Sequence, residues 1–179
     1  TLELRGASQN NIIKNINIGS NSEQIRKTIF HAYKKSPNFN KVYNLVNKTL
    51  KYSDNSNLAD TLFNSINNIV NYLGIKTKIF RSSDLEINKN LKGQEKIIEI
   101  CKSFKSSYYI NNFSGSKLYD PFTFSKNGIK LKFLKAKVMS YKQFNNDFIP
   151  NLSIIDILMF NNSAKIEQML LNYEISIKK

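Results

Sequence analysis

The stretch of residues 95–133 constrains the fold most, because its pattern changes from helix to strand and then to a polar loop. Its first part predicts a helix with one apolar face, since four side chains recur at helical spacing: Ile97, Ile100, Cys101 and Phe104. Strand formers occupy residues 107–110, and polar residues replace them where that strand would end. In open α/β sheets, ligands bind just beyond the carboxyl ends of strands, so this stretch predicts a binding site.

An earlier part of the chain has the same order of helix, strand and polar exit. Apolar spacing predicts a long amphipathic helix over residues 58–73, and Gly74 stands where a helix often ends. Residues 75–80 then predict a strand, and residues 81–84 leave it as a polar segment. Because two successive helix–strand units favour parallel pairing, we expect the strand at 75–80 beside the strand at 108–110, or one strand away. The expected fold class is α/β, a three-layer domain whose mostly parallel sheet is flanked by helices.

The segment after the polar loop alternates between apolar and basic residues. The odd-numbered positions are apolar (Ile129, Leu131 and Phe133), and the even-numbered positions between them are Lys130 and Lys132. Such alternation predicts a strand with one wet face, and we expect this strand near an edge of the sheet.

The polar exit at residues 81–84 is the first candidate site. Arg81 at the end of a strand can hold a phosphate or a carboxylate in two-point geometry. Ser82 and Ser83 add hydroxyl groups, and Asp84 can orient a hydroxyl or an amine. The alternative interpretation is an ordinary helix cap or turn.

The polar loop that ends the later helix–strand unit is the second candidate site. Gly115 lets a backbone approach a ligand closely, and Ser116 with Lys117 can complete an anion-binding nest. Asn111 precedes these residues and Asp120 follows them. The spacing of a P-loop is absent, and an ordinary turn is the alternative interpretation.

Asp156 is the third candidate, because it stands within an almost wholly apolar helix predicted over residues 152–160. A carboxylate in such a helix needs a hydrogen-bonding partner or faces a cleft. Two interpretations stay open: a catalytic acid or base with a raised pKa, or a structural cap for a neighbouring loop.

The formal net charge of +14 indicates an acidic partner such as nucleic acid, anionic lipid headgroups or phosphorylated ligands. Lysine carries nearly all of this charge, because Arg5, Arg26 and Arg81 are the only arginines. Proteins that recognise phosphates or bases usually use the planar fork of arginine. We therefore interpret codon bias in an AT-rich genome as the main source of the charge, with electrostatic steering of an acidic partner as a secondary effect.

The single cysteine and single histidine limit the chemistry of the chain. Cys101 has no intrachain disulfide partner, and its predicted place on an apolar helix face favours burial and an unreactive thiol. A catalytic pair of Cys101 with His31 is the alternative. No metal-ligand spacing and no Rossmann fingerprint occurs, so we expect no metal and no cofactor.

No run of apolar residues is long enough to cross a membrane, so we expect no membrane span and a cytoplasmic location. The length of 179 residues indicates one domain, or a domain with an appendage. The first residue is Thr1, which suggests a processed or truncated chain.

Five strings of this sequence, taken in order and spacing, resemble the WbqC-like protein family. They are KKSPNF at 34–39, YLGIKTKIFRSSDL at 72–85, IIEICKSFKSSYYINNFSGSKLYD at 97–120, NGIKLKF at 127–133 and FIPNLSIIDILMFN at 148–161. They extend over most of the chain, and their specificity lies in the set rather than in any one catalytic motif.

The resemblance implies a function in bacterial surface-polysaccharide biosynthesis. Members of the family are encoded among genes for O-antigen and other polysaccharides, and some are named as glycine or aminoacyl transferases acting on an amino sugar. The implied protein is a transferase that acylates an amino sugar carried on a nucleotide-sugar, and in the narrower form it glycylates that sugar. An aminoacyl-tRNA is one possible acyl donor for this reaction. The resemblance also implies one α/β domain over residues 1–179 that lacks the family's N-terminal segment.

This implied substrate assigns roles to the candidate residues. The expected substrate-binding residues have polar or small side chains: Arg81, Ser82, Ser83, Asn111, Gly115, Ser116 and Lys117. Among them, Arg81 and Lys117 are expected to contact phosphates, and Ser83 and Asn111 the sugar. The expected catalytic carboxylates are Asp84, Asp120 and Asp156. Either Asp84 or Asp120 is expected to orient or deprotonate the amine.

Two further interpretations of the whole chain stay open. One is a non-catalytic, basic nucleic-acid-binding α/β module, which the charge supports and the lack of known nucleic-acid-binding signatures weakens. The other is a scaffold subunit of a sugar-modifying complex.

Overall fold

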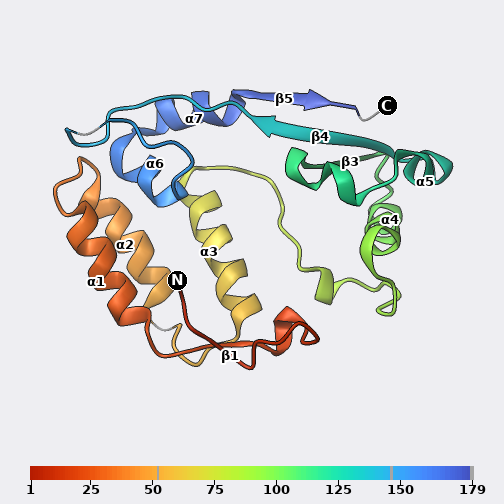
Figure 1. Cartoon of the computed structure of the whole chain (residues 1–179), viewed down its shortest axis with the longest axis horizontal. Coiled ribbons are helices and arrows are strands. Elements are labelled where there is room, and N and C mark those ends of the chain that lie inside the picture. Colours follow the sequence, from red (N-terminus) through yellow and green to blue (C-terminus); the bar gives the residue numbers. More distant parts are fainter. Residues whose placement is uncertain (52, 146, 178–179) are drawn as a thin grey trace. The chain divides into compact units, whose positions relative to one another are not determined.

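The computed structural model describes residues 1–51, 53–145 and 147–177. The chain combines helices with small sheets (Figure 1), which confirms the expected α/β class in its coarse form. It divides into two compact units: unit 1 comprises Thr1–Ile79 and Ser140–Glu167, and unit 2 comprises Phe80–Met139 and Gln168–Lys179. The single domain over residues 1–179 stays a prediction beside this division.

Unit 1 is built mainly from helices. They are α1 (Ser22–Tyr33), α2 (Phe39–Leu50), α3 (Leu58–Tyr72) and α6 (Ile154–Phe160), and α7 (Ser163–Leu171) begins in this unit. Two short antiparallel strands, β1 (Leu4–Arg5) and β2 (Asn17–Ile18), are joined through the 3-10 helix η1 (Ile13–Asn15).

The core of unit 1 forms where α2 meets α6. Val42 of α2 and Leu158 and Met159 of α6 are fully buried, and Ile166 of α7 joins them. Burying side chains of this size contributes roughly 1.5–3 kcal/mol each. Because Leu158 and Met159 lie one turn or less from Asp156, this packing also sets the position of that carboxylate.

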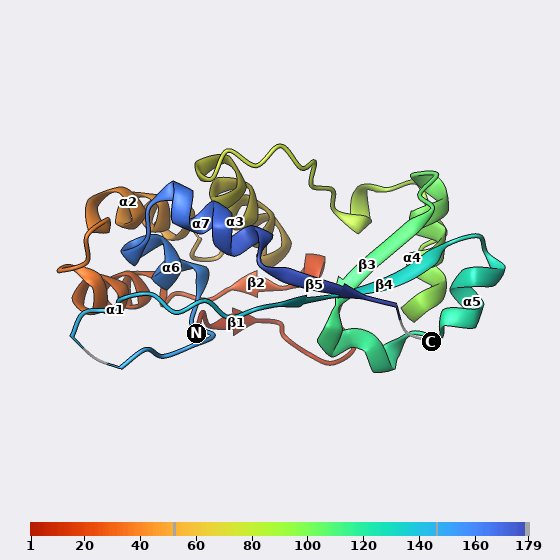
Figure 2. The same cartoon turned by 90° about the horizontal axis from the view of Figure 1, so that it is seen from above.

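Unit 2 contains a three-stranded sheet in the order β3–β4–β5. The strands are β3 (Tyr108–Asn112), β4 (Lys130–Ala136) and β5 (Tyr173–Ser176); β3 and β4 run parallel, and β4 and β5 run antiparallel. Between β3 and β4 the chain forms the 3-10 helix η3 (Phe113–Leu118) and then α5 (Pro121–Lys126). The 3-10 helix η2 (Ser82–Asp84) and α4 (Gly93–Ser103) precede β3 (Figure 2).

One face of this sheet packs against α4 and α5. Ile98 and Cys101 of α4, Phe124 of α5, and Leu131 and Phe133 of β4 form its core. The prediction that Cys101 is buried is confirmed, and burial raises the pKa of its thiol. A thiol in this state is a packing group and a poor nucleophile.

The predicted apolar face of the helix in unit 2 is partly wrong. Phe104 lies just beyond the end of α4 and is 45 % exposed, where its ring contacts that of Phe80 at 4.9 Å between centroids. Ile98, which the predicted face omits, is buried instead. The helix ends before Phe104 because Lys105 turns the backbone into the left-handed region, with φ of 52°.

The predicted strand at residues 75–80 is wrong, since this segment is an extended connection without strand pairing. It crosses the boundary between the two units, and Phe80 is 56 % exposed. A segment with strand-forming residues becomes a strand only when a neighbouring strand pairs with it and a surface packs against it. The composition of residues 75–80 does not show whether such neighbours exist. The expected parallel pairing of this segment with β3 is therefore also wrong, and β3 pairs in parallel with β4.

The position predicted for the lysine-alternating strand is also wrong. β4 is the middle strand of its sheet rather than a strand near an edge, because β5 from the C-terminal region pairs with it. In the described part of the chain, the sheets are one antiparallel pair and one mixed three-stranded sheet, so a three-layer, mostly parallel sheet is not confirmed.

Candidate functional site

A polar loop follows the carboxyl end of β3, where the sequence predicts a site. Asn112 ends the strand and caps η3: its Oδ1 accepts hydrogen bonds from the backbone N–H of Ser114 at 3.0 Å and from Ser114 Oγ at 2.8 Å. The backbone N–H of Asn112 donates to Oδ1 of Asn111 at 2.8 Å. These short-range bonds hold the loop in shape without distant partners.

Gly115 allows this loop to approach Asn111 closely. A Cβ atom at this position would lie 2.8 Å from Nδ2 of Asn111 and 3.7 Å from Cε2 of Tyr119. Any larger residue would therefore displace the Asn111 amide. The structure thus brings together Asn111 and Gly115, two of the predicted substrate-binding residues.

Basic side chains accompany this loop at the edge where β3 and β4 end. Ser116 and Lys117 lie in η3, with Lys117 exposed. Lys135 stands near the carboxyl end of β4, and its Nζ lies 5.8 Å from the ring centroid of Phe113. Parallel strands bring their carboxyl ends to one edge, so Lys135 joins Lys117 as a candidate basic residue of this loop, and sequence reasoning missed it.

Asp120 lies after the loop and caps α5. Its Oδ1 accepts a hydrogen bond from the backbone N–H of Phe122 at 3.2 Å, and its Oδ2 accepts one from that of Thr123 at 3.0 Å. Pro121 follows at the first helical position, where its missing N–H costs nothing. The structure thus gives Asp120 a capping role, and its catalytic role stays a prediction.

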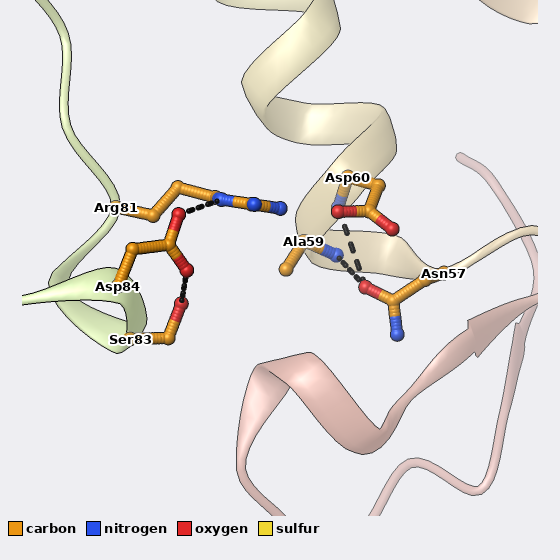
Figure 3. Close-up of polar contacts among 6 residues, drawn as sticks. All are labelled: Asn57, Ala59, Asp60, Arg81, Ser83 and Asp84. Carbon is orange, nitrogen blue, oxygen red and sulfur yellow. Dashed lines mark hydrogen bonds and ion pairs between the residues drawn. The ribbon is translucent and has the colours of Figure 1, made fainter.

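Arg81 and Asp84 form an ion pair at the start of unit 2 (Figure 3). Arg81 Nε donates to Asp84 Oδ2 at 2.7 Å, and Ser83 Oγ donates to Asp84 Oδ1 at 3.0 Å. The two paired side chains are 34 % and 54 % exposed, so water screens the pair and its net stabilisation is about 0–1 kcal/mol. Ser82, Ser83 and Asp84 form η2 and do not leave a strand, which supports the turn interpretation of this cluster.

Parallel pairing of residues 75–80 with β3 would place Arg81 and Gly115 at one edge of the sheet, facing one cleft. Because residues 75–80 form no strand, that reason no longer holds. The joint action of Arg81 with the Gly115 loop stays a prediction.

Asp156 is only 3 % exposed and belongs to the first turn of α6. Its Oδ1 accepts a hydrogen bond from the hydroxyl of Tyr33 at 3.0 Å. Its Oδ2 accepts hydrogen bonds from the hydroxyl of Tyr141 at 2.6 Å and from Nε2 of Gln143 at 2.7 Å. These donors replace the water that the carboxylate loses on burial.

Gln143 links this carboxylate to the loop that precedes α6. Its Oε1 accepts from the backbone N–H of Ile149 at 2.8 Å, and its Nε2 donates to the carbonyl oxygen of Ile149 at 3.1 Å. Gln143 itself is buried. The arrangement supports the interpretation of Asp156 as a structural anchor for a neighbouring loop, and a catalytic role stays a prediction.

The two tyrosines of this network are held as hydrogen-bond donors. Burial, followed by the hydrogen bond to Asp156, raises the pKa of Tyr141 to about 12. The same two causes, in the same order, raise the pKa of Tyr33. Both phenols therefore stay protonated at neutral pH and cannot act as general bases there.

Sequence reasoning identified Asp156 but missed its partners. A carboxylate in an apolar helix signals that donors must exist, yet Tyr33 is 123 residues away and Gln143 is 13 residues away. Only the fold selects these donors from the many tyrosines and amides of the chain.

The predicted site residues divide between the two units. Asp156 belongs to unit 1, whereas the other predicted residues belong to unit 2. Within unit 2, the structure joins Arg81, Ser83 and Asp84 by direct contacts, and separately places Asn111 against Gly115.

Two properties of the described residues bear on the class of protein. No group of three or more His, Cys, Asp or Glu side chains in the described ranges could hold a metal ion. Within those same ranges, each helix is too short or too polar to span a bilayer.

Comparison with known proteins gives one match. The model of the WbqC-like protein family matches residues 1–168, which includes the larger part of both units. Neither the curated proteins nor the solved structures contain a match to the chain.

Proposed function

The chain belongs to the WbqC-like protein family, and from this premise we propose that it is a transferase of bacterial surface-polysaccharide biosynthesis. It acylates, and in the narrower form glycylates, the amino group of a nucleotide-activated sugar in the cytoplasm. The match of the family model to residues 1–168 is the observation that carries this proposal.

The polar loop after β3 supports a phosphorylated ligand at that edge of the sheet. Its amide and hydroxyl groups can hydrogen-bond a sugar, and Lys117 and Lys135 supply positive charge. Asn111 lies against Gly115, where the absence of a Cβ lets the loop stay close to the strand. The net charge of +14 attracts a diphosphate over a longer range.

Arg81 is the second proposed phosphate contact. Its guanidinium is partly exposed and already makes a charge-assisted hydrogen bond to Asp84. A ligand phosphate can replace that carboxylate as acceptor, since the exposed pair is held only weakly. Asp84 would then be able to accept a hydrogen bond from the sugar's amine.

The proposed reaction is an acyl transfer from an ester or thioester donor. The amine nitrogen attacks the acyl carbonyl carbon, the new C–N bond forms, and the bond from that carbon to oxygen or sulfur breaks. The proton lost by nitrogen passes to a carboxylate and then to the leaving oxygen or sulfur. We assign the carboxylate to Asp84 rather than Asp120. The oxygens of Asp120 hold backbone N–H groups of α5, whereas those of Asp84 hold side chains at an exposed ion pair, which a ligand can replace.

Product analysis tests the reaction directly. The purified chain is incubated with UDP-glucosamine and either acetyl-coenzyme A or glycyl-tRNA, and the nucleotide-sugar is examined by mass spectrometry. The expected result is an amide product with one donor, and its loss in Asp84→Asn. In parallel, deletion of the gene should remove one acyl or glycyl group from the surface polysaccharide. An unaltered polysaccharide together with no product would contradict the proposal.

Titration with the same nucleotide-sugar tests the phosphate contact. Arg81→Ala should weaken binding at least about tenfold, since an oriented, charge-assisted hydrogen bond contributes about 1.5–3 kcal/mol. Arg81→Lys keeps the charge but should weaken binding nearly as much as Arg81→Ala does, because lysine lacks the planar fork of arginine. Lys48→Ala, an exposed position on α2, is the control and should change binding little. If Arg81→Ala and Lys48→Ala lose the same affinity, the net charge of the chain alone would account for binding, and the contact by Arg81 would be contradicted.

A further inference from the structure

The sheet of unit 2 has two faces of different character. On the face toward α4 and α5, Leu131 and Phe133 are 5 % and 1 % exposed. On the opposite face, which we call the open face, the alternate positions are exposed: Tyr108 by 44 %, Ile110 by 48 % and Ile175 by 45 %. The register places these residues on one side, because Ile110 pairs with Lys132 and Leu134 pairs with Ile175.

Lysine and aromatic side chains are interleaved on the open face. Lys132 Nζ lies 4.5 Å from the ring centroid of Tyr108, and Lys130 Nζ lies 5.6 Å from it. Tyr173, on β5, is 41 % exposed on the same side. The face therefore offers two exposed aromatic rings, and the ammonium groups of Lys130 and Lys132 lie over one of them, that of Tyr108.

Acidic side chains are kept off this face. Glu174 alternates with Tyr173 and Ile175 along β5, so it belongs to the other parity, and it pairs with Lys137 at 2.7 Å. Of the strand positions that the structure describes on the open face, none carries a carboxylate. The face is thus complementary to a polyanion that also carries aromatic rings.

We propose that the open face, centred on Tyr108, Lys130 and Lys132, binds single-stranded nucleic acid. Unpaired bases stack on exposed aromatic rings, and lysines neutralise the phosphates between them. A duplex hides its base faces, and an anionic lipid surface has no rings to stack. From Tyr108 to Tyr173 the face extends about 20 Å, given about 3.3 Å per residue along a strand and about 4.8 Å between strands, which accommodates several nucleotides. This proposal is independent of the transferase function.

Fluorescence anisotropy with a labelled oligouridylate decamer and the full chain tests the proposal. Tyr108→Leu should weaken binding about tenfold, whereas Tyr108→Phe, which keeps the ring, should bind as the unchanged chain does. A duplex of the same length should bind more weakly than the single strand. Unchanged affinity in Tyr108→Leu would overturn the proposal.

A charge-matched pair of variants separates a localised interface from the general charge of the chain. Lys130→Gln with Lys132→Gln should reduce the slope of log affinity against log salt by about 1.4, which is about 0.7 for each phosphate contact. Lys41→Gln with Lys48→Gln removes the same charge from exposed positions of α2 and should change the slope less. Equal changes for the two pairs would overturn the proposal. The lysine variants also keep the test valid if Tyr108→Leu does not fold.

Sedimentation velocity without nucleic acid tests whether a second copy of the chain covers the open face. The proposal expects no change in oligomeric state between the unchanged chain and Tyr108→Leu. A dimer that Tyr108→Leu dissociates would show that a second copy covers the face, and would overturn the proposal.

Discussion

Asp156 in unit 1 and Asp84 in unit 2 are both hydrogen-bonded carboxylates, but water reaches only one of them. Asp156 is 3 % exposed and accepts from Tyr33, Tyr141 and Gln143. The side chain of Asp84 is 54 % exposed beside Arg81. A buried carboxylate whose acceptors are engaged holds structure, whereas an exposed one can exchange its partner for a ligand. Burial rather than residue type therefore separates the anchor from the candidate catalytic group.

The largest expected effect comes from Asp156→Asn. This change replaces one of the two acceptor oxygens with an NH2 group that faces hydrogen-bond donors, so the free energy of unfolding should fall by about 3 kcal/mol. Urea unfolding at neutral pH measures it. Asp84→Asn is the matched control and should cost less than about 1 kcal/mol, because its pair is exposed. If both variants lose the same free energy of unfolding, Asp156 would not anchor the fold more strongly than Asp84 does.

Removing one donor of the anchor should have a smaller effect. Tyr141→Phe deletes the hydroxyl that donates to Asp156 at 2.6 Å, and we expect a loss of about 1.5 kcal/mol in the free energy of unfolding. Tyr72→Phe, on an exposed tyrosine of α3, should be nearly neutral. If the two tyrosine variants unfold at the same urea concentration, the hydroxyl at position 141 is not part of the anchor.

Alkaline pH should narrow the difference between the unchanged chain and Tyr141→Phe. The pKa of Tyr141 is raised from 10.0 to about 12 in the folded state, so the neutral phenol stabilises the fold fully below pH 10.0. This contribution is lost as the pH rises through about 12, because the folded-state phenol then ionises too. Urea unfolding of both proteins across this range measures the change, and a constant difference would contradict the shift.

The smallest expected effect concerns the loop of the candidate site. Gly115→Ala places a Cβ 2.8 Å from Nδ2 of Asn111, and the amide can move aside at a cost of about 1 kcal/mol or less. In the Asn111→Ala background the same change should cost almost nothing, so a double-mutant cycle isolates the contact. The single change should weaken nucleotide-sugar binding more than stability, since it displaces a proposed sugar contact. Additive costs would show that the two residues do not interact.

Local patterns predicted local features of this chain well. The turn interpretation of residues 81–84, the polar loop after β3 and the two-sided character of β4 all follow from residues close in sequence. The burial of Cys101 also followed from spacing within one helix. The resemblance of five strings identified the family that the match to residues 1–168 shows.

Predictions that needed a distant partner were less successful. Residues 75–80 have the composition of a strand, but no strand pairs with them in the described structure. β4 became the middle strand because Tyr173–Ser176, far along the chain, pair with it. The catalytic roles of Asp84, Asp120 and Asp156 stay predictions for the measurements above.

The sequence by itself determined the family of this chain, its mixed α/β class, its positive charge and the positions of its polar loops. Tertiary structure alone decided which of these groups water can reach. It brought Tyr33, Tyr141 and Gln143 to Asp156, and it left Tyr108 exposed with the ammonium groups of two lysines over its ring. The physical reason is that caps, turns and periodicity depend on neighbours within a few residues, whereas burial and hydrogen-bond partners depend on contacts between distant parts of the chain.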